Sequence, residues 1–206
     1  MKASRVAAKI TLSLDTCISD DQQSFFANAL NKADFIQLLS SCLHNEGFII
    51  IQADADADTD IVDTALREAA SQKSVAIAAD DTDILILLVH HLKDYMHDIV
   101  LVSQNRNKVT KQCNQVSIRE VQRAVGRQVS RQLLAIHAIG GCDTTSAVFG
   151  IGKETILKRL TAGMQFVGCT DTLQNHLATV DEVVSSGLQL MIGLYGGKTD
   201  QSINKL

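Results

Sequence analysis

Two short apolar runs, each followed at once by a group of aspartates, constrain the fold of this chain more than any other feature. Residues 48–51 (FIII) precede alternating aspartates at 54–60, and residues 75–79 (VAIAA) precede residues 80–83 (DDTD). Short continuous apolar runs are typical of strands that are buried on both faces. A third run at 99–102 (IVLV), with helical patterns between the runs, favours a parallel α/β sheet covered by helices.

The rest of the chain supplies one more expected strand and a series of helices. Alternating residues predict a strand at 10–14, and glycines at 47 and 126 predict a helix stop and a helix break. Apolar periodicity predicts helices at about 31–46, 59–72, 84–95, 117–125, 128–139, 144–148, 153–160 and 180–194. The buried face of the second helix is expected to hold Ile61, Val62, Leu66 and Ala69.

Length and composition predict one globular domain over residues 1–206, with a sheet part at about 1–116 and a helical part at about 117–206. The chain is 46% apolar and 20% charged, values typical of a folded domain. No apolar run approaches the roughly 18 residues of a membrane span, and no signal-peptide pattern is found at the start. Five cysteines without a C-x-x-C pair favour a reducing compartment, so we expect an intracellular protein, nuclear or cytoplasmic. The sequence does not indicate the oligomeric state.

The clustered aspartates predict a divalent-metal site. Carboxylates packed closely repel one another, and a cation between them removes the repulsion. Parallel strands carry their sites at the carboxyl edge of the sheet, which is where the first two groups fall. Oxygen ligands without a His/Cys set suit one or two Mg²⁺ or Mn²⁺ ions, and such ions commonly act on phosphates.

Simpler interpretations stay open for each aspartate taken singly. Asp58 could cap the helix that follows, Asp60 could favour the positive end of its dipole, and the other groups could be solvated turns. A calcium-binding EF-hand loop starting at Asp54 is excluded, because it would need glycine at position 59 and glutamate at 65. Residues 58–62 (DTDIV) match a phosphatase pattern that we keep as a minor alternative.

Positive charge gathers in one part of this acidic chain, whose net charge is −4. Residues 104–134 contain seven lysines or arginines and one acid, Glu120. Four arginines recur every fourth residue, at Arg119, Arg123, Arg127 and Arg131, and would line one side of a continuous helix. This side could face nucleic acid or could be an ordinary solvated helix face.

Four motifs in this order resemble those of PIN-like nucleases, the superfamily that includes flap endonucleases. They are residues 52–58 (QADADAD), 79–83 (ADDTD), 137–145 (HAIGGCDTT) and 150–153 (GIGK). The chain is most similar to an uncharacterised PIN-like group that occurs in many copies in some animal genomes. The resemblance covers about residues 30–197.

The resemblance implies a fold and a set of site residues. The implied fold is α/β, a PIN-like three-layer sandwich with a central, mainly parallel sheet, followed by a helical C-terminal part with a helix-turn-helix-like phosphate clamp. The implied catalytic and metal-binding residues are Asp56, Asp58, Asp81, Asp83 and Asp143. The implied nucleic-acid-binding residues of the clamp are Gly150, Gly152, Lys153, Lys158 and Arg159.

The function implied is metal-dependent hydrolysis of phosphodiester bonds in DNA or RNA. The family begins with a strand and a metal-binding aspartate that, in similar sequences, lie upstream of the first residue here. Asp15 ends a strand-like run but stands beyond that motif, so we expect impaired cleavage. The alternative is an inactive PIN-like remnant that binds nucleic acid or protein without cutting. The choice between DNA and RNA, and the structure that is cut, are not indicated by the sequence.

Overall fold

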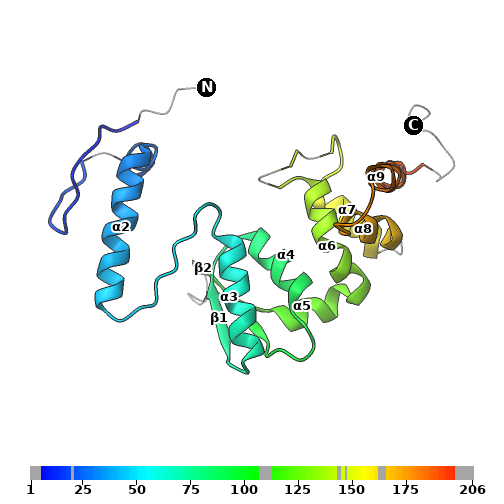
Figure 1. Ribbon diagram of the computed structural model, residues 1–206, viewed down its shortest axis with the longest axis horizontal. Helices are drawn as coiled ribbons and strands as arrows, with labels where there is room; N and C mark the ends of the chain where they lie inside the picture. Colours follow the sequence, from blue (N-terminus) through cyan, green and yellow to red (C-terminus); the bar gives the residue numbers. More distant parts are fainter. Residues whose placement is uncertain are drawn as a thin grey trace. The chain divides into compact units, whose positions relative to one another are not determined.

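The computed structural model describes residues 6–19, 21–106, 113–142, 145–146, 148–161 and 166–197 (Figure 1). The chain divides into two compact units, residues 1–54 and 55–206. The prediction of a single domain stays a prediction. In the described ranges, every helix is too short or too polar to cross a bilayer.

The first unit is built around α2, with the short α1 before it. Helix α1 spans Gln22–Phe26 and α2 spans Ala29–Asn45, so the helix predicted at about 31–46 is confirmed. Asn28 caps α2 by accepting from the backbone N–H of Leu30 at 3.0 Å, and Gly47, with φ of +86°, follows its end.

The predicted strand at 10–14 is wrong, because this segment pairs with a side chain of α2 and not with a strand. Asn31 is fully buried, accepts from the N–H of Ile10 at 3.0 Å and donates to the carbonyl of Ala8 at 2.9 Å. The buried amide satisfies two backbone groups that a neighbouring strand would otherwise satisfy.

The predicted strand at 48–51 is also wrong. These residues are irregular, and Phe48, Ile49 and Ile51 are 59%, 90% and 59% exposed. An apolar run indicates a tendency to form a strand, but a strand also needs a pairing partner. Within the described residues, the sheet contains only segments that come later in the chain.

The second unit contains a three-stranded mixed sheet in the order β1-β2-β3. Strands β1 (Val75–Ala78) and β2 (Ile99–Arg106) are parallel, as predicted, and β3 (Cys113–Ser117), which was not predicted, is antiparallel to β2. In β1, Ile77 is buried whereas Ala76 and Ala78 are exposed, so this strand is covered on one face. A mixed α/β architecture is confirmed, and the PIN-like sandwich stays a prediction.

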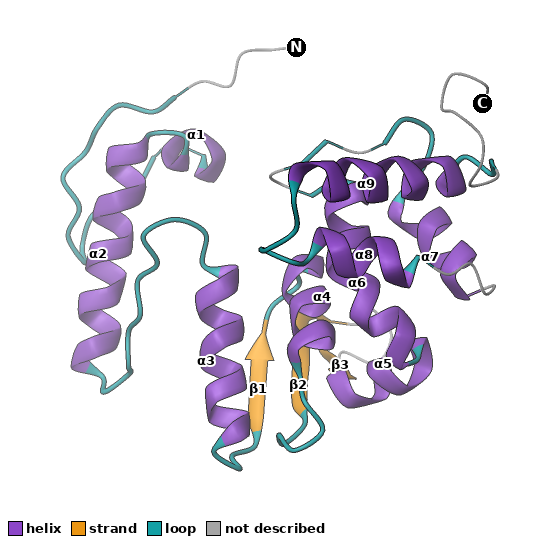
Figure 2. Ribbon diagram, turned by 45° about the vertical axis from the view of Figure 1, so that its right-hand side comes forward, coloured by secondary structure: helices purple, strands orange, loops and turns teal. Residues whose placement is uncertain are grey.

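Three helices pack with this sheet around one core. They are α3 (Asp58–Ala70), α4 (Thr82–His91) and α5 (Ile118–Val125), and α3 lies alongside β1 (Figure 2). The core is formed by Val62, Ala65, Ala69, Ile77, Ile84, Leu88, Val89, Leu92, Ile99, Leu101 and Ile118. Ile61, predicted to be buried, is 36% exposed, because α3 turns Ala65 inward in its place.

In the described part of the chain after Gly126, four more helices pack around a second core. They are α6 (Arg127–Gly140), α7 (Lys153–Thr161), α8 (Val167–Leu173) and α9 (Val180–Leu194), of which α8 was not predicted. Gly126 separates α5 from α6 with φ of +84°, a conformation that favours glycine and confirms the predicted break. The predicted helix at 144–148 is wrong for its described members, because Thr145 instead forms an isolated bridge with Cys142.

Candidate functional site

Three predicted aspartates converge where two helices begin. One carboxylate oxygen from each of Asp58, Asp81 and Asp83 lies within 4.8 Å of the others. Asp58 is the first residue of α3, and Asp81 and Asp83 flank the start of α4, which follows the carboxyl end of β1. We call these residues the acidic trio. The positive ends of two helix dipoles therefore meet at the trio and partly offset the repulsion of its charges.

Two of these aspartates also have local structural roles. Asp81 caps α4, since its Oδ1 accepts from the N–H of Asp83 at 2.8 Å. Asp83 pairs through its Oδ1 with Nε2 of His137, at 3.2 Å. Among the described residues, neither of these two contacts involves the second oxygen, Oδ2.

The neighbouring aspartates lie outside the acidic trio. Asp56 is exposed and accepts from the N–H of Asp58 at 3.2 Å, which holds the turn before α3. Asp80 accepts a hydrogen bond from the hydroxyl of Ser103 on β2. Asp143, the third predicted element of the site, lies outside the described residues.

His137 is a site residue that the sequence analysis did not assign. Its ring is 11% exposed and joins α6 to the carboxylate of Asp83 on α4. Nδ1 of the same ring is buried and has no partner among the described residues. A histidine six residues before an aspartate of a predicted motif was the available signal, but its partner 54 positions upstream could not be known from spacing.

The acidic trio offers the kind of ligands that a hard divalent cation would need. Two oxygens bound to one Mg²⁺ ion at about 2.1 Å lie about 3 Å apart when adjacent and about 4 Å apart when opposite. The separations within the trio reach at most 4.8 Å, somewhat more than the spacing of ligands around one ion. The donors are all carboxylate oxygens, which suit Mg²⁺ or Mn²⁺ better than zinc.

The residues of the predicted phosphate clamp form a glycine turn followed by a helix, and the described side chains of this helix differ in their contacts. Gly150 has φ of +70°, a turn that favours glycine, and α7 begins just after Gly152. The side chain of Lys153 lies outside the described part of the chain. Lys158 is exposed and pairs with Glu154 at 2.7 Å, whereas Arg159 donates to the carbonyl of Leu194 and so joins α7 to α9.

Comparisons of the chain with protein-family models, with curated proteins and with solved structures gave no match. The resemblance to PIN-like nucleases therefore rests on the four sequence motifs. The chemistry of the site rests on the geometry of the acidic trio.

Proposed function

We propose that this chain is a metal-dependent, nuclease-like protein that hydrolyses phosphodiester bonds of DNA or RNA with Mg²⁺ or Mn²⁺. The observation that carries the proposal is the convergence of Asp58 with Asp81 and Asp83 from two separate segments. Solvated loops and helix caps do not by themselves require carboxylates from different helices to meet. Nucleic acids in the nucleus or cytoplasm are the expected substrates.

Each member of the trio has a definite part in this proposal. Asp58, Asp81 and Asp83 would hold the ion, and a bound divalent ion supplies activation of water and stabilisation of negative charge on a phosphate. Asp81 keeps its position because it also caps α4. His137 holds the Asp83 carboxylate in one orientation, so less freedom is lost when the oxygen binds an ion.

The proposal also includes residues whose roles stay predictions. They are the ligands Asp56 and Asp143 and the phosphate clamp at residues 150–159. Asp143 would add the carboxylate that follows α6. The backbone N–H groups at the start of α7, with the exposed Lys158, would bind phosphate groups without reading sequence.

A cleavage assay tests the proposal directly. The full chain is incubated with labelled duplex, flap, hairpin and single-stranded DNA and RNA, with millimolar Mg²⁺ or Mn²⁺ and with EDTA. We expect ion-dependent cleavage that is lost in Asp58→Asn and in Asp83→Asn. Asp63→Asn serves as the matched control, because Asp63 lies on α3 outside the acidic trio.

The variants also separate this activity from a contaminating nuclease, which would cut equally in every preparation. Cleavage that persists in Asp83→Asn contradicts the proposal. Binding of the same substrates without cleavage in any ion supports the alternative function, an inactive PIN-like protein that binds nucleic acid.

A further inference from the structure

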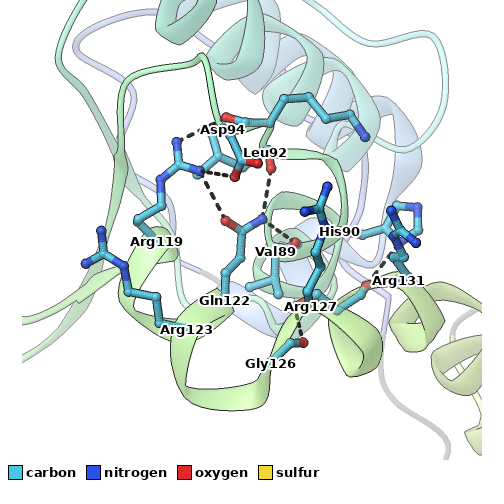
Figure 3. Close-up of a pocket in the computed structure, with 12 residues that line it drawn as sticks. Val89, His90, Leu92, Asp94, Arg119, Gln122, Arg123, Gly126, Arg127 and Arg131 are labelled. Carbon is cyan, nitrogen blue, oxygen red and sulfur yellow. Dashed lines mark hydrogen bonds and ion pairs between the residues drawn. The ribbon is translucent and has the colours of Figure 1, made fainter. Parts of the chain in front are cut away.

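A basic pocket of about 540 Å³ lies where α4, α5 and α6 meet, apart from the acidic trio (Figure 3). We call it the basic pocket; its lining includes Lys93, Arg119, Arg123, Arg127 and Arg131. Asp94 is the acidic residue in the lining. Its size is that of a small-ligand site, but its charge suits an anion.

The arginines reach the pocket from two helices. They recur every fourth residue, but Gly126 ends α5 and α6 begins at Arg127, so they do not form the stripe of one continuous helix. The bend at Gly126 instead sets Arg119 and Arg123 on one helix opposite Arg127 and Arg131 on the next. The break at Gly126 therefore arranges the arginines around a pocket and not along one helix face.

One arginine of the set has a structural role. The guanidinium of Arg119 donates to the carbonyls of Met96 at 2.8 Å and Lys93 at 3.0 Å, and lies 3.6 Å from Asp94. Beside it, Gln122 donates to the carbonyls of Val89 and Leu92, at 2.8 and 2.9 Å (Figure 3). These bonds satisfy carbonyl groups at the end of α4 and fix one wall of the pocket.

The other three arginines are available. Arg123, Arg127 and Arg131 are exposed, and no described residue forms a hydrogen bond or ion pair with their guanidinium groups (Figure 3). With Asp94 beside Arg119, their charge is not compensated within the pocket. Several uncompensated guanidinium groups on one concave surface raise the local concentration of anions, and guanidinium binds phosphate in a bidentate manner.

The pocket and the acidic trio lie along one pair of antiparallel helices. Asp83 and His90 are seven residues apart on α4, hence on the same side of it, and contact His137 and Ser130 on α6, also seven residues apart. The rise of 1.5 Å per residue separates the two contacts by about 10 Å. Along a nucleic-acid strand, with about 3.4 Å per nucleotide, this is about three nucleotides.

From this arrangement we propose that the basic pocket binds phosphate groups of a nucleic-acid backbone through Arg123, Arg127 and Arg131, about three nucleotides from the acidic trio. The choice of nucleic acid as the ligand rests on the proposed function, whereas the presence of a cationic pocket is observed independently of it. Because the arginines contact phosphates and not bases, binding is independent of sequence and weakens with salt.

The test measures the binding of a short fluorescent DNA duplex to the full chain in EDTA. Fluorescence anisotropy gives the binding constant at each of a series of salt concentrations. The pocket variant is Arg123→Gln with Arg127→Gln and Arg131→Gln. The matched control, Lys32→Gln with Arg67→Gln and Lys73→Gln, removes three positive charges outside the pocket lining. Circular dichroism melting confirms that both variants are folded.

We expect the pocket variant to bind at least about tenfold more weakly and to lose about 3 from the slope of log K against log salt, about 1 for each phosphate contact. The control should keep the slope of the unchanged chain. Equal slopes for the pocket variant and the control overturn the proposal. Two other results also overturn it. If inorganic triphosphate competes for the pocket as well as unlabelled duplex does, the pocket is a small-anion site. If poly-glutamate binds with the same salt slope as the duplex, the partner is an acidic protein.

This experiment is independent of cleavage. It is done without divalent ions, so it gives the same result whether or not the acidic trio is catalytic. A pocket variant that binds the duplex with the salt slope of the control contradicts the pocket and leaves the proposed function standing. A chain that binds the duplex through the pocket but cleaves no substrate supports the pocket and contradicts the proposed function.

Discussion

Nε2 of His137 lies 3.2 Å from Oδ1 of Asp83 and joins α6 to the first turn of α4. The contact is made by Oδ1 of the aspartate and does not involve Oδ2. Since the histidine is nearly buried and the aspartate only partly so, α6 holds the more exposed carboxylate in place.

His137→Ala should weaken the binding of Mn²⁺ by about 10- to 100-fold, the usual effect of removing a group that orients a metal ligand. Free Mn²⁺ measured by electron paramagnetic resonance during a titration gives the affinity. His137→Gln, which keeps an N–H donor, should recover part of the loss. If the alanine variant melts at a lower temperature but binds Mn²⁺ as before, the role of His137 is structural only.

Asp81→Asn combined with Asp83→Asn should raise the melting temperature of the metal-free chain and reduce its response to Mn²⁺. The substitutions remove repulsion within the acidic trio, and asparagine caps a helix as well as aspartate does. In the unchanged chain, Mn²⁺ at 100 times its Kd should add about 2.7 kcal/mol to the free energy of unfolding. Asp60→Asn with Asp63→Asn is the matched control on α3, and its Mn²⁺ response should be unchanged.

Gln122→Ala should lower the free energy of unfolding by about 1–3 kcal/mol, because the carbonyls of Val89 and Leu92 lose a donor. Urea unfolding should show a lower midpoint with an unchanged slope. Gln128→Ala, at an exposed position on α6, should change stability by less than about 0.5 kcal/mol. Equal effects of the two substitutions would show that the contact with α4 contributes nothing.

Stability should fall as the pH is lowered from 7 towards 5. Burial lowers the pKa of His90 and of His91 below 6.5, and the charge of Lys93 lowers both further. Two contacts oppose these shifts: the hydrogen bond with the Ser130 carbonyl raises the pKa of His90, and the charge of Asp63 raises that of His91. The unfolded chain therefore binds protons at a higher pH than the folded chain, so acidification through this window favours unfolding. In His90→Gln with His91→Gln, the slope of the unfolding free energy against pH should be smaller over that range. His97→Gln, an exposed histidine, is the control.

The sequence predicted the elements that local patterns determine. Helices α2, α3, α6 and α9 have periodic apolar residues and clear ends, and β1 and β2 are apolar runs that pair with each other. The sequence did not predict β3, because residues 113–117 (CNQVS) are mostly polar and become a strand by pairing with β2. At 48–51 a strand was predicted where the structure has none, and the cause is the same, because strand formation depends on a partner far away in the sequence.

The acidic trio was predicted in part for a similar reason. The motifs placed aspartates near the start of two helices, but whether Asp56 or Asp58 reaches the neighbouring helix depends on the residue where α3 begins. The contact of His137 with Asp83, and the pocket around Gly126, depend on how α6 packs against α4. Spacing along the chain does not encode packing between helices.

Helix α4 has opposite charge at its two ends. Asp81 and Asp83 stand at its start, and beyond its end come Lys93 and the guanidinium of Arg119, which donates to the Lys93 carbonyl. Each end complements the partial charge of the helix terminus, so the sites stabilise the helix that separates them. In the proposed function, a nucleic-acid chain lying along α4 would be attracted at the basic end of the helix and repelled at the acidic end. A divalent cation bound by the acidic trio would remove that repulsion, so metal ions would decide how far along α4 the nucleic acid can extend.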